Sequence, residues 1–489
     1  MRTKLKLLSW LIDAATLPAA GRTAPLPGDD PAQYEAQRKR QIAYMRRQLP
    51  HYLRRLTWSR EQVLAEQTRA LREMLRHAKE NSPWYARRLK GIDVDRIDGA
   101  TVDLLPVMTK REFMENWDEI VTDRSLDFES ASQRLAANTD DFYIGNGHHV
   151  VASGGSSGYP GLFAFDWHGW SAMALGPLRG LLALSLHLKM SPLGTGAVIY
   201  ADRAGHSSYS LARTFSSRSQ RIAQFPVMLP PEEIVSGVND VKPMLISCYS
   251  SYLPVLTEAR REGRLKASPK LIWTSAEPLS DADRLKAEEA FGCTVVNTWG
   301  ATESMGSMPA MGQPGMYMSD DMNVFEYIDE QGRAIGPGET SNGILITNLY
   351  SKLMPIIRYE LSDQFVLSEE PAAYGMPFTH VDRVRGRADD VFRYGGIPVH
   401  PVVFWTYLDR MDGLIEFQIR QLPKGADILV VTSKPVDWTG VIGELTGALR
   451  HLGIPDPEVR IREVESIERQ AIGKLKRFVP LERDEAAAS

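Results

Sequence analysis

Residues 271–303 read LIWTSAEPLSDADRLKAEEAFGCTVVNTWGATE and indicate the fold class. The first part of this stretch, Leu271–Ser275, contains β-branched and aromatic residues and predicts a strand. Charged residues spaced among Ala and Leu predict a helix over Asp281–Phe291, and Thr294–Trp299 predicts a second strand. Strand, helix and strand in this order favour two parallel strands joined by a crossover helix.

The same alternation occurs upstream of this stretch. Ala197–Ala201 and Met244–Tyr249 predict strands, and Tyr252–Arg261 predicts a helix after the second of them. We therefore expect an α/β fold with a parallel sheet. Such sheets bind ligands at the carboxyl ends of their strands, so the loops that follow the strands are where we look for chemistry.

The composition is that of a globular protein, with 489 residues of which 43% are hydrophobic and 24% are charged. Lys and Arg number 57 against 61 for Asp and Glu, and the net charge of -4 gives no general attraction to nucleic acid or to an anionic membrane. We therefore expect no nucleic-acid partner. A site for phosphate must be local.

Cysteine usage and hydropathy indicate the compartment. Cys248 and Cys293 both fall in or beside apolar runs, which supports neither a disulfide framework nor a zinc site and fits a reducing cytoplasm. Basic residues before the apolar run Leu7–Ile12 resemble a short signal or membrane-surface segment, but Asp13 ends that run early. No later stretch approaches the about 20 apolar residues of a membrane span, so we expect a cytoplasmic protein.

The last part of the chain predicts a separate domain. Residues 386–396 are dense in glycine and charge and predict a hinge, and the ~100 residues that follow have the size of a small α+β domain. Its predicted elements are strands over Phe417–Leu422, Ile428–Thr432 and Glu458–Val464 and a helix over Val441–Leu452. At the other end, residues 30–90 carry apolar residues at helical spacing.

A loop rich in glycine and serine follows the β-like pair Val150–Val151. It spans Ser153–Gly161 and reads SGGSSGYPG. Glycines let backbone N–H groups crowd around an anion, and the hydroxyls donate further bonds, so the loop could hold phosphate. A solvent-exposed loop is the alternative on composition alone. The loop lacks the Gly-Lys-Ser/Thr signature of the common nucleotide triphosphatases.

A second candidate segment, Trp299-Gly300-Ala301-Thr302-Glu303, follows a predicted strand. The indole of Trp299 could cover a base, the Thr302 hydroxyl could bind phosphate, and the Glu303 carboxylate suits a hard cation such as Mg²⁺. An interior Trp beside a surface Glu is the alternative.

Three further segments carry charge. In the run 354–363, Arg358, Tyr359 and Asp363 place a cation, a phenol and a carboxylate close together, and a carboxylate can accept hydrogen bonds from two ribose hydroxyls. The segment 386–390 sets Arg387 beside paired acids, which could equally be an exposed hinge held by ion pairs. The segment 469–477 holds a basic cluster, which in isolation is typical of a solvated tail.

Taken in order, these five segments resemble the core motifs of the adenylate-forming superfamily, which includes acyl-CoA synthetases, the adenylation domains of peptide synthetases, and luciferases. The resemblance covers about residues 65–480 and is strongest to the branch that contains phenylacetate–CoA ligases and coenzyme F390 synthetases. The features that indicate this branch are Leu105–Lys110, the turn Ser275–Pro278, and Met354–Asp363.

The resemblance implies a role for each matched position. Lys474 would bridge the acid and the α-phosphate, Thr302 would contact the α-phosphate, and Glu303 would bind Mg²⁺. Asp389 would be the hinge. The ATP-binding positions would be Ser153, Gly154, Gly155, Ser156, Ser157 and Gly158 for pyrophosphate, Ala276, Glu277, Pro278, Trp299 and Gly300 around adenine, Asp363 for the ribose, and Arg387 for ribose or phosphate.

The resemblance also implies the domain organisation. We expect a helical N-terminal extension over residues 1–64 and a large adenylation domain of several subdomains with βαβ sheets over 65–386. A small, mobile α+β domain over 387–489 would carry the catalytic lysine. A lysine and Mg²⁺ would stabilise the charge that builds up when a carboxylate attacks a phosphate, and no protein base is needed.

The sequence departs from the family at two places. The family's loop carries a Lys beside its Pro, whereas here Tyr159 precedes Pro160 and Gly161 follows it, so one positive contact to pyrophosphate is missing. The stretch 184–225, which helps to form the acid pocket in relatives, does not match, and the identity of the acid stays open. Our candidates for the pocket are His206, Tyr209, Tyr249, Ser250 and Tyr252; a loop or cap histidine is the alternative for His206.

Three functions compete on these observations. The leading hypothesis is an ATP- and Mg²⁺-dependent ligase that activates a small carboxylic acid as an acyl-adenylate and transfers the acyl group to CoA. The second sends the acyl group to an amine, a hydroxyl or the thiol of a carrier protein in a biosynthetic pathway. The third is a member of the fold that binds nucleotide without turnover, suggested by the missing lysine. The sequence leaves the oligomeric state open.

Overall fold

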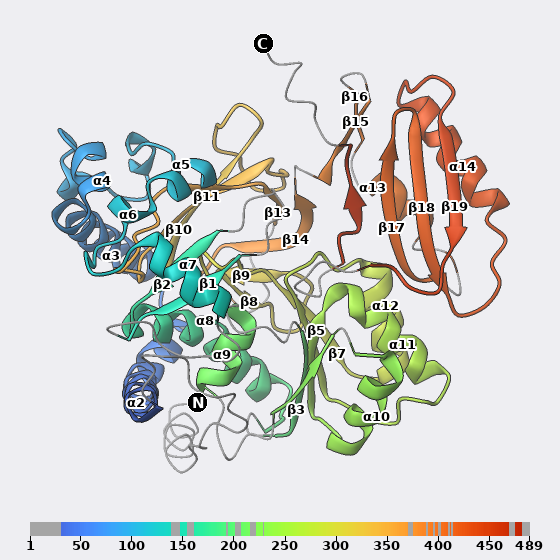
Figure 1. The fold of residues 1–489 in the computed structure, drawn as a ribbon, viewed down its shortest axis with the longest axis horizontal. Coiled ribbons are helices and arrows are strands. Elements are labelled where there is room, and N and C mark those ends of the chain that lie inside the picture. The colour runs from blue at the N-terminus through green and yellow to red at the C-terminus, as the bar shows by residue number, and fades with distance from the viewer. Residues whose placement is uncertain are drawn as a thin grey trace.

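A computed structural model describes residues 31–137, 147–153, 161–191, 194–200, 207–215, 222–227, 229–369, 375–387, 390–394, 397–399, 402–408, 411, 414–468 and 475–481. Figure 1 shows N-terminal helices in blue, a helix-covered sheet in green and a small C-terminal α+β unit in red. The mixed α/β fold with a separate C-terminal unit is the one that the sequence predicts.

Helices form the first part of the described chain. They are α2 Pro31–Arg55, α3 Arg60–Asn81, α4 Pro83–Arg88, α5 Lys110–Glu115, α6 Trp117–Ile120 and α7 Phe128–Ala137, with the 3-10 turns η1 Val94–Arg96 and η2 Val102–Leu104. A capping box begins α3: Ser59 Oγ accepts from Gln62 N (3.3 Å), and Gln62 Oε1 accepts from Ser59 N (2.9 Å). The expected division between residues 64 and 65 falls inside α3.

Helix α2 packs along α8, which spans Trp167–His187. Met45 and Leu49 of α2 share a buried apolar cluster with Leu175 and Leu182 of α8. Helix α2, which lies in the expected N-terminal extension, is therefore packed on the body of the protein through residues 45–53.

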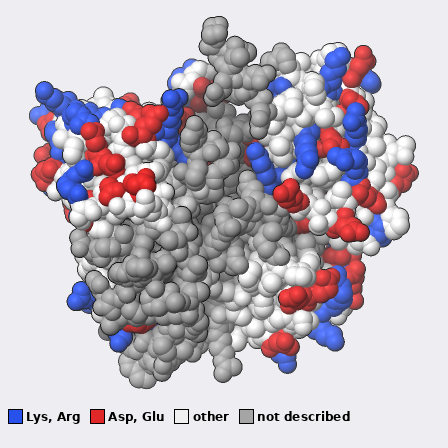
Figure 2. Space-filling model, viewed as in Figure 1, with Lys and Arg blue, Asp and Glu red and all other residues white. Residues whose placement is uncertain are grey.

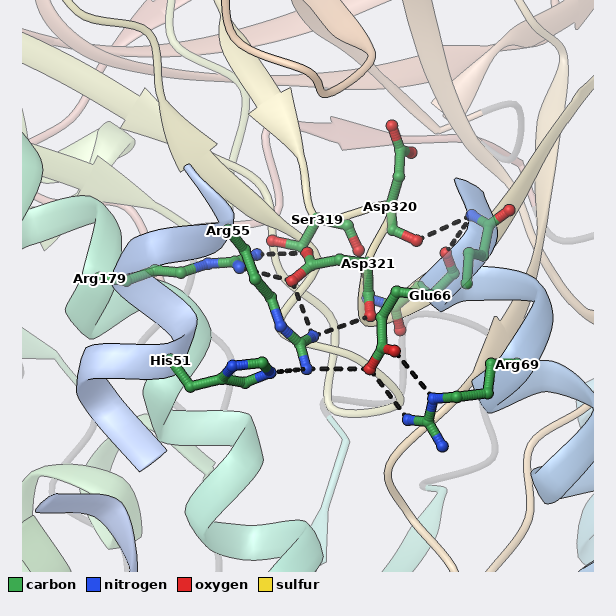
Figure 3. Close-up of polar contacts among 10 residues, drawn as sticks. His51, Arg55, Glu66, Arg69, Arg179, Ser319, Asp320 and Asp321 are labelled. Atoms are coloured by element: carbon green, nitrogen blue, oxygen red, sulfur yellow. Dashed lines mark hydrogen bonds and ion pairs between the residues drawn. The ribbon is translucent and has the colours of Figure 1, made fainter. Parts of the chain in front are cut away.

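An ionic network at this junction joins the helices to the loop before β10 (Asn323–Ile328), as Figure 3 shows. Arg179 of α8 donates to both carboxylate oxygens of Asp321, at 2.7 Å each, and both side chains are fully buried. Arg55 of α2 donates to Asp321 (3.0 Å) and to Glu66 of α3 (3.0 Å). The network therefore connects α2, α3 and α8 through charges removed from water.

A five-stranded parallel sheet has the order β4-β3-β5-β6-β7. Its strands are β3 Gly196–Tyr200, β4 Ile222–Pro226, β5 Leu245–Tyr249, β6 Leu271–Ser275 and β7 Thr294–Thr298. Figure 1 shows α10 (Pro231–Val241), α11 (Leu253–Arg261) and α12 (Asp281–Phe291) on one side of this sheet. Helix α12 begins at the N-cap Ser280 and ends at Gly292, which takes a left-handed φ of 63° that glycine adopts without strain.

Antiparallel strands form most of the remaining body. The pair β1 His149–Ala152 and β2 Leu162–Phe165 precedes α8, and α9 spans Ser207–Phe215. One sheet has the order β10-β11-β12, and a second has the order β13-β14-β9-β8. Their remaining bounds are β8 Ser307–Pro309, β9 Met316–Met318, β11 Gly343–Asn348, β12 Tyr359–Leu361, β13 Asp363–Leu367 and β14 His380–Arg387; η3 spans Ser250–Tyr252.

The strands and the helix predicted for the C-terminal unit are confirmed. A sheet with the order β19-β18-β17-β20 packs on α13 and α14 around a core that contains Phe404, Phe417 and Leu445. The bounds are β15 Phe392–Tyr394, β16 Ile397–Val399, α13 Val402–Leu408, β17 Leu414–Leu422, β18 Gly425–Thr432, α14 Thr439–His451, β19 Glu458–Glu463 and β20 Phe478–Val479. Strand β17 contacts α11 of the parallel-sheet unit.

The surface carries charges of both signs. Figure 2 shows Lys and Arg intermingled with Asp and Glu over the described part of the face in view, in keeping with the small net charge. Among the described helices, none has the length and apolar character needed to cross a bilayer.

Candidate active site

The segments that the sequence singled out after β5, β6 and β7 meet at one edge of the parallel sheet. Tyr249 is the register partner of Ser275, and Ser275 is the register partner of Thr298. Residues 249–252, 275–278 and 298–300 therefore leave adjacent strands at the same carboxyl edge, as predicted.

The turn after β6 is fixed by hydrogen bonds. Ser250 Oγ donates to the carbonyl oxygen of Glu277 (2.9 Å), and Asn297 Nδ2 donates to the same oxygen (3.4 Å). Ala276 takes a φ of 69°, a left-handed conformation that costs a non-glycine residue of order 1 kcal/mol and persists only where its surroundings enforce it. The turn that the sequence assigned to the adenine site is thus rigid.

The Glu277 carboxylate binds main-chain groups of the protein itself. Oε2 accepts from Ser251 N (2.8 Å), and Oε1 accepts from Leu475 N (3.2 Å). The second bond comes from the C-terminal unit, so this side chain links the two parts of the molecule.

A second contact joins the same parts. The Arg477 guanidinium lies 3.8 Å from the Asp283 carboxylate of α12, and its Cζ lies 4.9 Å from the centre of the Phe417 ring. The segment after Lys474 is therefore docked beside the carboxyl edge of the parallel sheet.

Asp363 and Arg387 are register partners at the ends of β13 and β14. The preceding residue, Gly386, has a φ of 128°, and a Cβ placed on it would lie 3.8 Å from Pro278 Cγ. The structure thus brings the backbone of Arg387 and the half-buried Asp363 close to the turn after β6.

Trp299 lies in the interior. Its ring is 8% exposed and meets Phe365 and Phe325 edge-on, with centroids 5.3 and 6.3 Å away. This placement matches the alternative of an interior Trp for the ring, and its stacking on adenine stays a prediction. Glu303 is 4% exposed and so is not the surface Glu of that alternative, and Gly300 and Thr302 are half-buried.

Arg358 and Tyr359 belong to the core rather than to a site. The Arg358 guanidinium makes a two-pronged ion pair with Glu326 (2.7 and 2.9 Å) and also donates to the Asp103 carbonyl (3.1 Å), and Tyr359 is fully buried. Of the three groups that the sequence offered in this run, only Asp363 is near the carboxyl edge.

The pocket candidates after β5 are buried among other side chains. Tyr249, Ser250 and Tyr252 are each at most 3% exposed, and both tyrosines belong to the apolar cluster under the sheet. Tyr209 lies on α9, which contacts β1. The pocket role of these residues stays a prediction.

Sequence reasoning missed Tyr200, which ends β3 and meets Tyr249 edge-on at 4.6 Å. Its hydroxyl lies 2.8 Å from Ser275 Oγ and donates to the Cys248 carbonyl (2.9 Å), and burial raises the pKa of the phenol, which therefore stays protonated. Its position at a strand end was the signal that could have found it.

The glycine-serine loop closes on itself at its base. Ser153 N donates to the Gly161 carbonyl (2.8 Å), and Gly161 N donates to Ser153 Oγ (3.0 Å). Lys110, at the start of α5, places its ammonium 3.4 Å from the same hydroxyl. Lys110 is the last residue of the motif Leu105–Lys110, and it thus places a cation at the base of the glycine-serine loop.

Several predicted site residues lie outside the described part of the chain. They are Gly154, Gly155, Ser156, Ser157, Gly158, His206, Asp389 and Lys474, and the side chain of Arg387 is also outside it. Among the described residues, no group of three His, Cys, Asp or Glu could hold a metal ion without other ligands.

Comparison with known proteins independently supports the resemblance to phenylacetate–CoA ligases. No family model matches the chain. The phenylacetate-coenzyme A ligase of Aromatoleum evansii is 24% identical over 446 residues, which cover 86% of this chain and 95% of that protein. The phenylacetate-coenzyme A ligase of Thermus thermophilus is 24% identical over 362 residues, covering 71% and 75% of the two chains.

A solved structure of 2-hydroxyisobutyryl-CoA ligase in the postadenylation state, in complex with 2-HIB-AMP, matches with a TM-score of 0.67 at 20% identity over 88% of this chain and 92% of that one. The chain resembles CoA ligases in sequence and in fold. Its similarity to phenylacetate–CoA ligases, predicted from the motifs, is confirmed.

The fold of this chain can be compared with two states of that ligase. The thioesterification state of the same ligase, with 2-HIB-AMP and CoA, matches with a TM-score of 0.56 at 19% identity over 87% of this chain and 91% of that one. The value for the postadenylation state is higher at nearly equal coverage. The fold of the whole chain therefore matches the postadenylation structure better than the thioesterification structure.

Proposed function

We propose that the chain uses ATP to activate a carboxylic acid as an acyl-adenylate and then transfers the acyl group to the thiol of CoA. The observation that carries the proposal is the convergence of the turn 276–278, Asp363 and the segment next to Lys474 at one sheet edge. Similarity to CoA ligases over most of the chain supports the same activity.

In the first half-reaction, a carboxylate oxygen of the acid attacks the α-phosphorus of ATP. The bond from this phosphorus to the oxygen that bridges to the β-phosphate breaks, and pyrophosphate leaves with that electron pair. Lys474 would stabilise the negative charge shared by the two reactants, and Thr302 would donate to the α-phosphate. Asp363 would accept hydrogen bonds from the ribose hydroxyls.

Glu303 fits a role in binding Mg²⁺. Its side chain is almost fully buried beside the carboxyl edge, and Mg²⁺ is commonly held by one or two carboxylates together with substrate phosphates rather than by an all-protein cage. When bound, Mg²⁺ would neutralise phosphate charge.

Lys110 compensates for the missing lysine of the glycine-serine loop in our proposal. Its ammonium reaches Ser153 Oγ, and position 159 in the same loop is Tyr. We infer that Lys110 supplies positive charge to the leaving pyrophosphate.

The acceptor and the compartment belong to the proposal as well. CoA is favoured because the named relatives are CoA ligases, with an amine, a hydroxyl or a carrier-protein thiol as the alternative acceptors. A cytoplasmic location is supported by the two free thiols, Cys248 buried and Cys293 half-buried.

The test is to incubate the protein with ATP, Mg²⁺ and panels of aryl, aliphatic and amino acids, and then to offer CoA, amines or carrier protein in turn. We expect AMP release and a thioester with the mass of an acyl-CoA. A product formed only with an amine or a carrier protein would replace CoA as the acceptor. If no acid produces AMP, the proposed function is wrong.

A further inference from the structure

Glu277 receives hydrogen bonds from two distant parts of the chain. One carboxylate oxygen accepts from Ser251 N, next to β5, and the other accepts from Leu475 N, in the segment that leads into β20. Both partners are main-chain donors, and hydrogen bonds to a charged acceptor are about twice as strong as neutral ones. Its carboxylate is thus occupied by the protein itself rather than presented to a base.

The donor Leu475 directly follows Lys474 in the sequence. Consecutive Cα atoms lie about 3.8 Å apart across a peptide bond, so a bond that holds Leu475 N also restrains the main chain next to Lys474. Leu475 is 5% exposed and packs with Leu429 and Ile467 of the C-terminal unit. The lysine's neighbour is thus held by its own domain on one side and by Glu277 on the other.

The base of the Glu277 side chain is itself held in place. Two donors, Ser250 Oγ and Asn297 Nδ2, bind its carbonyl oxygen, and the preceding Ala276 has a left-handed φ. The carboxylate is therefore presented from a rigid turn, and Arg477 meets Asp283 beside it with both side chains at most 14% exposed. If the C-terminal unit swings as the family resemblance implies, the tail, which is the segment 475–481, is the mobile partner in this contact.

We propose that Glu277 is a positioning residue that docks the segment carrying Lys474 at the carboxyl edge of the sheet and so selects the arrangement in which the acid is adenylated. The inference rests on the adenylation reaction proposed above. The bond to Leu475 exists only while the tail is docked, so it must break before the C-terminal unit can move for the second half-reaction.

The test compares Glu277→Gln with Glu289→Gln, a matched change at an exposed position of α12. Glutamine keeps the size of the side chain but turns one acceptor into a donor that faces an N–H group. We expect acid-dependent ATP–pyrophosphate exchange to fall about tenfold or more in Glu277→Gln, as for loss of a hydrogen bond to a charged group. Acyl transfer to CoA from supplied acyl-adenylate should stay within about twofold of wild type, and Glu289→Gln should match wild type in both.

Unchanged pyrophosphate exchange in Glu277→Gln would overturn the proposal. An equal fall in both half-reactions would also overturn it, because that result indicates damage to the sheet edge rather than loss of positioning.

Amide hydrogen exchange measured at Leu475 and the residues up to 481 in the full chain without substrates gives a readout that is independent of activity. We expect faster exchange in Glu277→Gln than in wild type or Glu289→Gln, and equal exchange in all three contradicts the docking role. If wild type itself catalyses no pyrophosphate exchange with any acid, the proposed function fails, and this measurement alone decides whether Glu277 docks the tail.

Discussion

Arg179 is a fully buried charged residue that stabilises the fold through its ion pair with Asp321. It lies on a helix that is otherwise mostly apolar, and it meets Asp321 with both side chains fully buried (Figure 3). Burial raises the pKa of Asp321, but the charges of Arg179 and Arg55 outweigh this effect and hold the pKa below its ordinary value. The Asp321 carboxylate is therefore ionised in the folded protein near neutral pH.

We expect Arg179→Met to lower the free energy of unfolding by about 3–5 kcal/mol, because it leaves a buried carboxylate with only part of its compensation. Urea unfolding at pH 7 measures the change. Arg96→Met is the control: Arg96 pairs with Asp93 in solvent, with 87% of its side chain exposed, and its loss should cost less than about 1 kcal/mol. Equal effects of the two substitutions would contradict the role assigned to burial.

The same variant predicts a pH dependence. A carboxyl group whose pKa is lowered by folding stabilises the fold above its unfolded pKa of about 3.9, and this contribution is lost as the pH falls through the folded pKa. Without Arg179 the effect of burial gains weight and the pKa of Asp321 rises. The difference in stability between wild type and Arg179→Met should therefore shrink as the pH falls toward 4, and a difference that grows would contradict this assignment.

Lys110 is the residue that we propose supplies the positive charge missing from the glycine-serine loop. We expect Lys110→Met to slow acid-dependent pyrophosphate exchange about tenfold or more, since a charge-assisted bond to the leaving group is lost. Lys79→Met is a matched control, because Lys79 donates to the Ile92 carbonyl (3.1 Å) among the N-terminal helices. Exchange rates that do not differ between the two variants would leave Lys110 without this role.

At the level of elements, α3 depends on its first turn. Ser59→Ala removes the cap acceptor for Gln62 N and should lower the free energy of unfolding by about 1 kcal/mol, whereas Ser59→Asp keeps an acceptor and should restore it. Urea midpoints of the three proteins measure this. A loss of stability in Ser59→Asp equal to that in Ser59→Ala would show that capping is not the cause.

The sequence predicts elements well where their pattern is local. The strands before and after Asp281–Phe291 appear within one residue of their expected bounds, because apolar runs, a Ser N-cap and a Gly C-cap all lie in the same stretch. The antiparallel strands β8 and β9 were not predicted. Each spans only three residues, and β9 finds its second partner in β14, more than 60 residues further along the chain.

The candidate site was predictable in outline for the same reason. Loops after parallel strands share an edge by topology alone, which places residues 249–252, 276–278 and 299–303 together. The direction of Trp299 and the bond from Leu475 N to Glu277 were not predictable. A Trp in the sequence does not show whether its indole faces a ligand or the core. A main-chain N–H donor is present at every residue except proline, so no residue type indicates which one binds Glu277.

On the scale of the whole molecule, the C-terminal unit and the parallel-sheet unit meet at one edge of the parallel sheet. Strand β17 contacts α11, Leu475 binds Glu277 and Arg477 approaches Asp283, so the C-terminal unit faces the loops where ATP would bind.

Exchange of labelled pyrophosphate into ATP across a panel of carboxylic acids, measured for wild type and Lys474→Ala side by side, decides whether the protein forms an acyl-adenylate with the help of Lys474. We expect label to enter ATP only in the presence of a particular class of acid and to do so at least about a hundredfold more slowly in Lys474→Ala, as for removal of a group that stabilises transition-state charge. Exchange that needs no acid, or that proceeds equally well without Lys474, would contradict the account.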